Sequence, residues 1–254
     1  MGRKKIIEVK NIVKDYKGFK AVKGVSFDVY EGEIFGLLGP NGAGKTTTLE
    51  IIETLRDETE GDVIVAGKSI NKEPSAIKEM IGVQLQEAGF YPNLTLLQIM
   101  NLFADLYDVK IEALSILKKV GLGDKANAIF TKLSGGQKQR FSIATTLINK
   151  PKIIFLDEPT TGLDPQARRN LWDLIREINQ NETTIVMTTH YMEEAEFLCN
   201  RVGIMDEGKI IALDSPDNLV EKLLKTGFKG HKRTKEANLE DVFINLTGKE
   251  LRDE

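Results

Sequence analysis

The sequence predicts an α/β fold with a parallel-sheet core, and three observations support this prediction. Residues 33–38 form an apolar run that ends in a glycine-rich loop, and a helical pattern begins after the loop at about Lys45. Two further short apolar runs cover residues 153–156 and 184–188. An amphipathic helical pattern at residues 166–179 lies between them. Buried strands that alternate with helices are typical of a parallel sheet covered on both faces.

The N-terminal residues predict a small antiparallel β subdomain in front of this core. Residues 6–12 alternate between apolar and polar side chains, as a half-buried strand does. A second strand-like run covers residues 21–29, and the pair Lys17-Gly18 between the two runs predicts a turn. We therefore expect two antiparallel strands at one edge of the fold.

A helical insertion is predicted in the middle of the chain. Between about residue 87 and residue 150, helical periodicity replaces the strand patterns, most clearly at residues 96–103 and 111–120. We predict one domain over residues 1–225 that contains this insertion at 87–150. A short polar tail, residues 226–254, follows it.

The composition excludes several classes of protein. The 254 residues carry a net charge of −3, so bulk electrostatics does not indicate a nucleic-acid partner. The single cysteine, Cys199, rules out an internal disulfide and a cysteine-rich zinc site, as is typical of a reducing cytosol. No apolar run approaches the roughly 20 residues of a membrane-spanning helix. If the protein moves a molecule across a membrane, another chain must supply the channel.

The glycine-rich loop carries the first chemical motif, because it fits the phosphate-loop pattern G-x-x-x-x-G-K-[ST]. Glycines let backbone N–H groups converge on phosphate oxygens, and the N-terminus of the following helix adds positive potential. In this pattern Lys45 reaches the β- and γ-phosphates of a nucleotide, and the Thr46 hydroxyl is a ligand of Mg²⁺. The residues of the loop are Gly39, Pro40, Asn41, Gly42, Ala43, Gly44, Lys45, Thr46 and Thr47.

Two acidic residues follow the apolar run at residues 153–156. Asp157 and Glu158 would stand at the carboxyl end of a buried strand, where parallel α/β sheets bind ligands. We expect Asp157 to hold Mg²⁺, directly or through water, and Glu158 to polarise the water that attacks a phosphoryl group. The alternative is an Asp-Glu pair that caps a helix. The phosphate loop in the same chain favours the catalytic interpretation.

A second segment also has the composition of an anion-binding helix start. A serine and two glycines precede a helical pattern over residues 137–149, and such a start presents free N–H groups and a hydroxyl. Because the chain already has one phosphate loop, the segment indicates either a second site or the other side of a shared one. The alternative is a simple helix N-cap at Ser134. The segment consists of Leu133, Ser134, Gly135, Gly136 and Gln137.

In their order along the chain, the phosphate loop, the Leu-Ser-Gly-Gly-Gln segment and the Asp-Glu strand resemble the ATP-binding cassette (ABC) ATPases. The resemblance covers essentially the whole chain. It implies a P-loop NTPase (RecA-like) parallel-sheet core with an N-terminal antiparallel β subdomain and a helical signature subdomain. In that family two cassettes pair head to tail, with ATP between one phosphate loop and the other signature segment. The resemblance thus implies that Ser134, Gly135, Gly136 and Gln137 act on the ATP of a second ATPase subunit, in a homodimer or with a sister cassette.

Four more residues match positions of this family. Tyr16 stands where an aromatic ring stacks on adenine, and its alternative is an ordinary edge-strand side chain. Gln86 matches the glutamine that senses Mg²⁺ and the attacking water, and its neighbour Gln84 competes for the same position. The alternative for Gln86 is an ordinary glutamine in a surface loop. Asp164 matches the loop that communicates across the dimer, and before a proline it is also a good helix N-cap. His190 matches the switch histidine that contacts the γ-phosphate, although a lone histidine after a strand is more often structural.

The resemblance implies an ATP hydrolase that uses ATP and Mg²⁺. A lone subunit should bind ATP and hydrolyse it poorly, because a partner completes the site. The implied metal ligands are Thr46, Gln86 and Asp157, and the implied catalytic residues are Lys45, Gln86, Glu158 and His190.

The resemblance also implies an integral membrane permease subunit as partner, and a location at the cytoplasmic face of the cell membrane. Residues 239–243, Leu-Glu-Asp-Val-Phe, resemble the multidrug or antibiotic exporter branch, and their alternative is an amphipathic terminal helix.

Phe90 and Tyr91 match the border of the groove that receives the permease, or they pack under the helical insertion. The alternative function is a soluble ABC ATPase of the translation or DNA-repair type, which the single cassette, single cysteine and lack of a heptad run disfavour.

Overall fold

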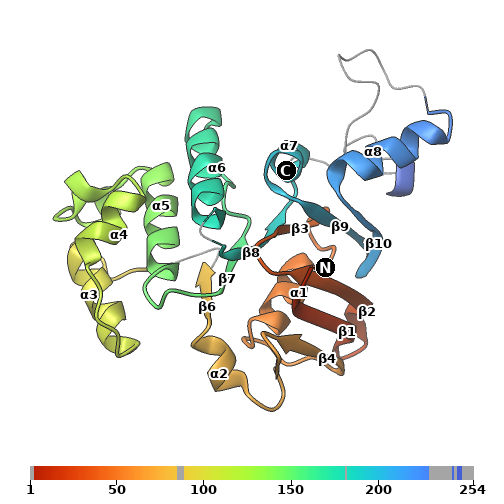
Figure 1. Cartoon of the computed structure of the whole chain (residues 1–254), viewed down its shortest axis with the longest axis horizontal. Helices are drawn as coiled ribbons and strands as arrows, with labels where there is room; N and C mark the ends of the chain where they lie inside the picture. The colour runs from red at the N-terminus through yellow and green to blue at the C-terminus, as the bar shows by residue number, and fades with distance from the viewer. Residues whose placement is uncertain (1–2, 85–88, 181, 229–241, 243–244, 248–254) are drawn as a thin grey trace.

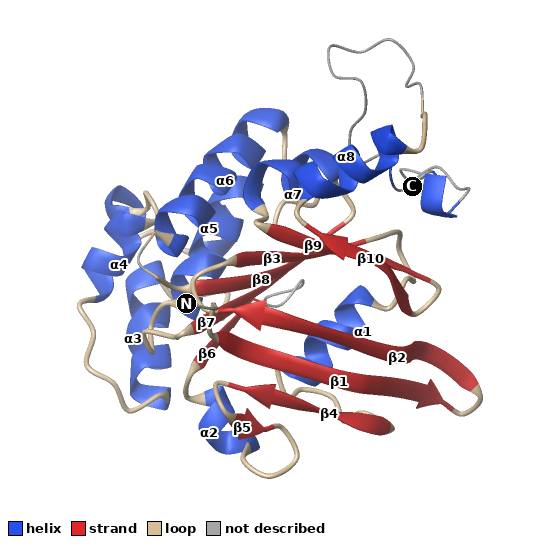
Figure 2. Cartoon of the chain, turned by 45° about the vertical axis from the view of Figure 1, so that its right-hand side comes forward, coloured by secondary structure: helices blue, strands red, loops and turns tan. Residues whose placement is uncertain are grey.

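Two β-sheets and the helices that cover one of them make up the fold (Figures 1 and 2). This computed structural model describes residues 3–84, 89–180, 182–228, 242 and 245–247. Among the helices of these residues, none has the length and the apolar character needed to cross a membrane.

The smaller sheet is antiparallel and contains the predicted N-terminal strands. Its strand order is β2-β1-β4-β5, and the β1–β2 hairpin turns at Lys17-Gly18, where both residues have positive φ. The Oδ1 atom of Asp15 accepts a hydrogen bond from the Gly18 N–H at 2.6 Å, which closes this turn. The strands are β1 (Lys5–Tyr16), β2 (Phe19–Tyr30), β4 (Glu60–Val65) and β5 (Lys68–Ser69).

The larger sheet is parallel except at one edge, which confirms the predicted core. Its strand order is β10-β9-β3-β8-β7-β6, and only the β9–β10 pair is antiparallel among the strands described. The three predicted apolar runs are its strands β3, β7 and β8. The strands are β3 (Ile34–Leu38), β6 (Ile81–Gln84), β7 (Ile153–Asp157), β8 (Thr184–Thr189), β9 (Arg201–Asp206) and β10 (Lys209–Asp214).

Helices lie on both faces of the larger sheet. Figure 2 shows α1 between the two sheets. In Figure 1, α3, α4 and α5 of the predicted helical insertion are grouped to the left of α6, away from the sheets. The helix predicted at residues 137–149 begins two residues earlier, because Ser134 caps it, and ends at Thr146. The helices are α1 (Lys45–Ile52), α2 (Pro74–Lys78), α3 (Leu96–Leu106), α4 (Ala113–Lys119), α5 (Gly135–Thr146), α6 (Pro165–Asn179), α7 (Met192–Leu198) and α8 (Pro216–Lys225), with 3-10 turns at Gly123–Lys125 and Phe130–Lys132.

Two hydrophobic cores bury both faces of the larger sheet. One core joins the small sheet, α1 and the large sheet through side chains such as Ile7, Ile51 and Phe35. The other joins the opposite face to helices α3 to α8 through side chains such as Ile154 and Ile175. Because both faces are covered, the central strands are continuously apolar, and polar residues gather only where those strands end.

Phe90 is half-buried and packs against the helical insertion, which confirms the second of the two alternatives predicted for it. Its ring contacts Phe103, Phe130 and Phe141 at centroid distances of 6.1, 4.7 and 5.0 Å. Edge-to-face packing of this kind favours burial of the ring over exposure to a partner. Tyr91, in contrast, is 60% exposed.

Candidate functional site

The phosphate-loop residues connect β3 to α1 and pack tightly against neighbouring backbone. A Cβ atom at Gly39 would lie 2.2 Å from the carbonyl oxygen of Met205, so only glycine fits there. Gly44 has φ +97°, and a Cβ atom at this position would meet the Ala21 carbonyl at 2.6 Å. No side chain caps the N-terminus of α1 after Gly44. Its first N–H groups are therefore available to an anion.

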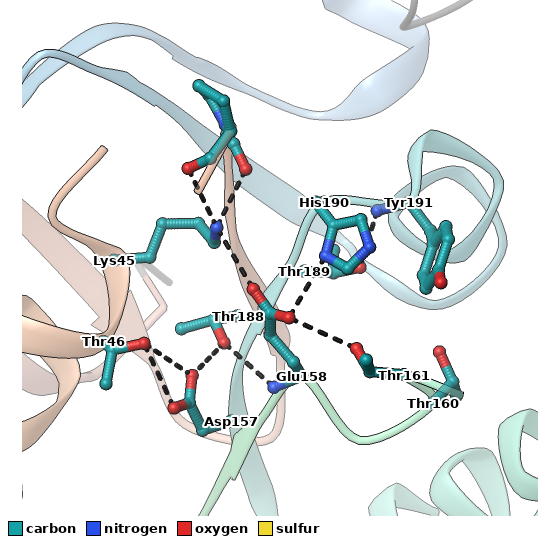
Figure 3. A network of polar contacts seen from close by, with 12 residues as sticks. Lys45, Thr46, Asp157, Glu158, Thr160, Thr161, Thr188, Thr189, His190 and Tyr191 are labelled. Carbon is teal, nitrogen blue, oxygen red and sulfur yellow. Dashed lines mark hydrogen bonds and ion pairs between the residues drawn. The ribbon is translucent and has the colours of Figure 1, made fainter. Parts of the chain in front are cut away.

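Lys45 points back along this loop and across to β7. Its Nζ atom donates hydrogen bonds to the carbonyl oxygens of Gly39 and Pro40 at 2.9 and 3.2 Å. The same atom lies 3.3 Å from Oε1 of Glu158 (Figure 3). Burial lowers the pKa of Lys45, and the negative charge of Glu158 opposes this shift.

Asp157 ends β7 and faces the first turn of α1. The Thr46 hydroxyl donates to its two carboxylate oxygens at 3.2 and 3.1 Å, and the Thr188 hydroxyl donates to Oδ1 (Figure 3). Burial raises the pKa of Asp157, while the hydrogen bonds from Thr188 and Thr46 oppose the rise.

The Thr46–Asp157 pair has the donor atoms that Mg²⁺ prefers, one hydroxyl and one carboxylate. Within the described part of the chain, no group of three or more His, Cys, Asp or Glu side chains could hold a metal. The pair therefore fits an ion that takes its other ligands from water and from the phosphates of a substrate, as Mg²⁺ usually does.

Glu158 lies immediately after β7 in a left-handed conformation, with φ 47°. Its N–H donates to the Thr188 hydroxyl at 3.0 Å, while its Oε2 atom lies 3.2 Å from Nδ1 of His190 and accepts from the Thr161 hydroxyl at 3.2 Å. The contact with His190 lowers the pKa of Glu158 to about 2, with Lys45 adding to the shift against the effect of burial. The carboxylate is thus ionised at neutral pH.

The structure brings together five residues predicted from three separate sequence segments: Lys45, Thr46, Asp157, Glu158 and His190 (Figure 3). Gln86 lies outside the described residues. Its competitor Gln84 is buried at the end of β6, and its Nε2 atom donates to Oε1 of Gln139 on α5 at 2.8 Å. This hydrogen bond links Gln84 to α5 of the helical insertion.

Tyr16 ends β1 with a ring that is 38% exposed. Lys14 Nζ and the Arg56 guanidinium carbon lie 5.4 and 5.5 Å from the ring centroid, and Arg56 is held by Glu50 at 2.5 Å. Two cationic side chains thus lie near the ring, which suits a nucleotide that stacks its base on the ring and carries negatively charged phosphates. The sequence reasoning did not identify Arg56, because its contact with Tyr16 spans forty residues.

The helix-cap alternatives at Ser134 and Asp164 are confirmed. Gln137 N–H donates to the Ser134 hydroxyl at 3.4 Å, and Ser134 N–H donates to Oε1 of Gln137 at 3.0 Å, which forms a capping box at the exposed start of α5. Oδ1 of Asp164 accepts from the N–H groups of Gln166 and Ala167 at 3.0 and 2.9 Å, at the start of α6. Roles across a dimer stay predictions.

Thr188, Thr161 and Thr160 were missed from the sequence, although each contacts a carboxylate. The available signal was their position: polar residues at the end of an apolar strand, or within three residues after two acids at the end of a strand, lie at the ligand-binding edge of a parallel sheet.

Comparison with known proteins identifies the family. The sequence pattern of the family described as "ABC transporter" matches residues 22–161, more than half of the chain. The chain belongs to the ABC transporter family. It is an ATP hydrolase of the ATP-binding cassette type, coupled to transport, and its cassette binds ATP.

Several named proteins and solved structures are similar to this cassette. It is 40% identical to the linearmycin resistance ATP-binding protein LnrL of Bacillus subtilis (strain 168), over 86% of this chain and 72% of that protein. It is 33% identical to the Nod factor export ATP-binding protein I of Burkholderia orbicola (strain AU 1054), over 97% and 98% of the two chains. Among solved structures, an ATP-binding subunit of an ABC transporter matches with TM-score 0.81 and 27% identity, over 95% and 99%. A dimeric cassette in a post-hydrolysis state with ADP and Pi matches with TM-score 0.75 and 32% identity, over 82% and 98%.

Proposed function

We propose that this cassette drives export of a drug, an antibiotic or a related compound through a separate integral membrane permease subunit. The observation that carries the proposal is the charge cluster of Lys45, Glu158 and His190 beside the Thr46–Asp157 pair, which suits phosphoryl transfer. The names of two relatives, for linearmycin resistance and Nod factor export, support export as the direction. No relative reported above is named for translation or DNA repair, so transport is favoured over a soluble ATPase.

Each residue of the cluster has a proposed role in hydrolysis. Lys45 and the loop N–H groups bind and neutralise the β- and γ-phosphates, and His190 contacts the γ-phosphate. The ionised carboxylate of Glu158 orients the attacking water and accepts its proton. Thr46 and Asp157, with Gln86, would hold Mg²⁺, which when bound neutralises charge on the phosphate oxygens.

We further propose that two cassettes close on ATP, either two copies of this chain or this chain and a sister cassette. In that pair Ser134, Gly135, Gly136 and Gln137 contact the γ-phosphate held by the other subunit, and Asp164 communicates between the sites. The exposed capping box supports this role, because it holds the N-terminus of α5 ready at the surface. The dimeric relative supports the pairing.

The permease would hold this cassette at the cytoplasmic face of the cell membrane. Residues 1–225 would form the ATPase domain, with the helical subdomain at about 87–150, and residues 226–254 the tail. Residues 239–241 and 243 of the Leu-Glu-Asp-Val-Phe tail lie outside the described residues. The exposed ring of Tyr91 is a candidate permease contact.

Co-purification and vesicle transport test the proposal. A six-helix membrane protein is sought among the neighbouring genes and expressed with the cassette, and phosphate release at saturating Mg-ATP is measured with and without that protein. We expect the permease to retain the cassette in membranes and to stimulate hydrolysis. Inside-out vesicles should then accumulate an exported compound with ATP, and not with the Glu158→Gln cassette. ATP hydrolysis that never responds to a membrane protein would contradict the transport role.

A further inference from the structure

Glu194 on α7 is a fully buried carboxylate that the proposed hydrolysis does not use. Its exposed fraction is 0%, and it lies four residues after His190. Burial raises the pKa of Glu194, and the side chains of Thr189, Thr160 and Trp172 oppose the rise. A carboxylate is rarely buried to this degree without specific partners, so the identity of those partners indicates its purpose.

The partners come from three different elements. Oε1 of Glu194 accepts from the Thr160 hydroxyl at 2.8 Å and from Nε1 of Trp172, on α6, at 2.9 Å. The hydroxyl of Thr189, the last residue of β8, lies near enough to lower the pKa of the carboxylate, while Oε2 of Glu194 has no hydrogen-bond partner among the described residues. Two of these three partners stand next to the proposed catalytic residues, since Thr160 follows Glu158 by two positions and Thr189 directly precedes His190.

Thr160 anchors the turn that leads from Glu158 to Asp164. Its side chain is fully buried, and its carbonyl oxygen accepts from the N–H of Leu163 at 3.2 Å. The next residue, Thr161, donates its hydroxyl to Glu158 at 3.2 Å. The bond from Thr160 to Glu194 thus fixes the turn. Thr161, in contrast, faces the catalytic carboxylate (Figure 3).

Thr189 anchors the segment that carries His190. Its hydroxyl accepts from the N–H of Tyr191 at 2.9 Å, so that the chain turns around His190. Its carbonyl oxygen accepts from the N–H of Gly39 at 3.3 Å, which links the same residue to the phosphate loop. Because the hydroxyl oxygen already accepts from Tyr191, its hydrogen is available to the Glu194 carboxylate.

We propose that Glu194 is a positioning residue that couples the turn between Glu158 and Asp164 to the segment around His190. Its carboxylate holds Thr160, and its own helix α7 begins directly after His190 and Tyr191, so a displacement of either segment is transmitted to the other. The inference rests on the proposed roles of Glu158 and His190 in hydrolysis. The competing explanation is that Glu194 only fastens α6 to α7 through Trp172, whose ring also packs on Phe197 at 5.0 Å.

Steady-state kinetics separates the two explanations. Glu194→Gln keeps one oxygen acceptor for Thr160 and Trp172 but replaces the other carboxylate oxygen by an amide NH2 group. We expect it to lower kcat by about tenfold or more, since a changed acceptor in a buried network weakens the whole network. The Kd for ATP should stay within about twofold, because the lost interaction acts on hydrolysis rather than on binding. Thr160→Val, which removes one donor, should show the same split.

Trp172→Phe is the matched control. It removes the Nε1 donor and retains the ring against Phe197, so it should lower Tm without lowering kcat at a temperature where the variant is folded. If Trp172→Phe loses as much kcat as Glu194→Gln, or if Glu194→Gln lowers Tm alone, the positioning role is wrong. If Glu194→Gln does not fold, Thr160→Val decides by the same criteria. A wild-type-like rate in Glu158→Gln would instead refute the proposed hydrolytic site itself.

Discussion

The Nζ atom of Lys45 lies 3.3 Å from Oε1 of Glu158, so the phosphate-loop lysine and the acid that follows β7 neutralise each other. Both side chains are buried, with exposed fractions of 4% and 9%. A phosphate that binds Lys45 competes with this ion pair. We therefore expect nucleotide binding to free Glu158 for water, which would link occupancy of the loop to activation of the carboxylate.

Glu158→Gln tests the role of this carboxylate. The amide keeps the size of the side chain and a contact to Thr161, but it cannot accept a proton at neutral pH. We expect kcat to fall by about 100-fold or more, the range typical of a lost general base, with ATP affinity retained. Phosphate release and equilibrium nucleotide binding measure the two effects. Activity near the wild-type rate would show that another group activates the water.

The pH dependence of stability should reveal Glu53 at the end of α1. Its side chain is 3% exposed, and Oε1 has no hydrogen-bond partner among the described residues. Burial, with Asp157 and Glu50 adding to it, raises the pKa of Glu53 from 4.5 to about 8. Between these two values the folded state keeps a proton that the unfolded state has released. The free energy of unfolding therefore falls as pH rises through this window.

Glu53→Gln removes that dependence, because the amide does not titrate. We expect the variant to match the wild type near pH 4 and to exceed its free energy of unfolding by about 1–3 kcal/mol near pH 8. Urea unfolding across this range measures the difference. Glu60→Gln, which removes an exposed carboxylate from β4, is the control and should not change the slope. Parallel curves for wild type and Glu53→Gln would contradict the assignment.

Tyr16→Ala should weaken nucleotide binding selectively. Stacking of a base on an aromatic ring contributes about 1–3 kcal/mol, so the Kd for ATP should rise roughly 5- to 100-fold. Tyr16→Phe retains the ring and should bind normally. Phe19→Ala removes a neighbouring ring that is 68% exposed and provides the matched control. Equal affinities in Tyr16→Ala and Phe19→Ala would leave Tyr16 an ordinary strand residue.

The sequence predicted the central strands, Lys45 and Thr46 of the phosphate loop, and Asp157 and Glu158 because these follow from local rules. His190 was predicted only from the resemblance to the ABC family. Continuous apolar runs become central strands, and the residues after parallel strands meet at one edge of the sheet. Glu194 was not predicted, since its contacts with Thr160 and Trp172 join residues 34 and 22 positions apart. The position of Phe90 stayed open between two alternatives for the same reason, because a ring in a loop shows no periodicity and its packing depends on tertiary contacts.

Ser134→Asp separates the two roles of the residue that starts α5. Aspartate is as good an N-cap as serine, and its charge suits a helix N-terminus, so Tm should not fall. If the same position faces the γ-phosphate of a second subunit, the added negative charge repels that phosphate and ATP-driven pairing is lost. We expect ATPase activity to drop at least about tenfold, with ATP binding to the monomer unchanged. Ser134→Ala gives the complementary result, a lower Tm from the lost cap. If Ser134→Asp pairs with ATP and hydrolyses it like the wild type, then Ser134 serves only as the cap of α5.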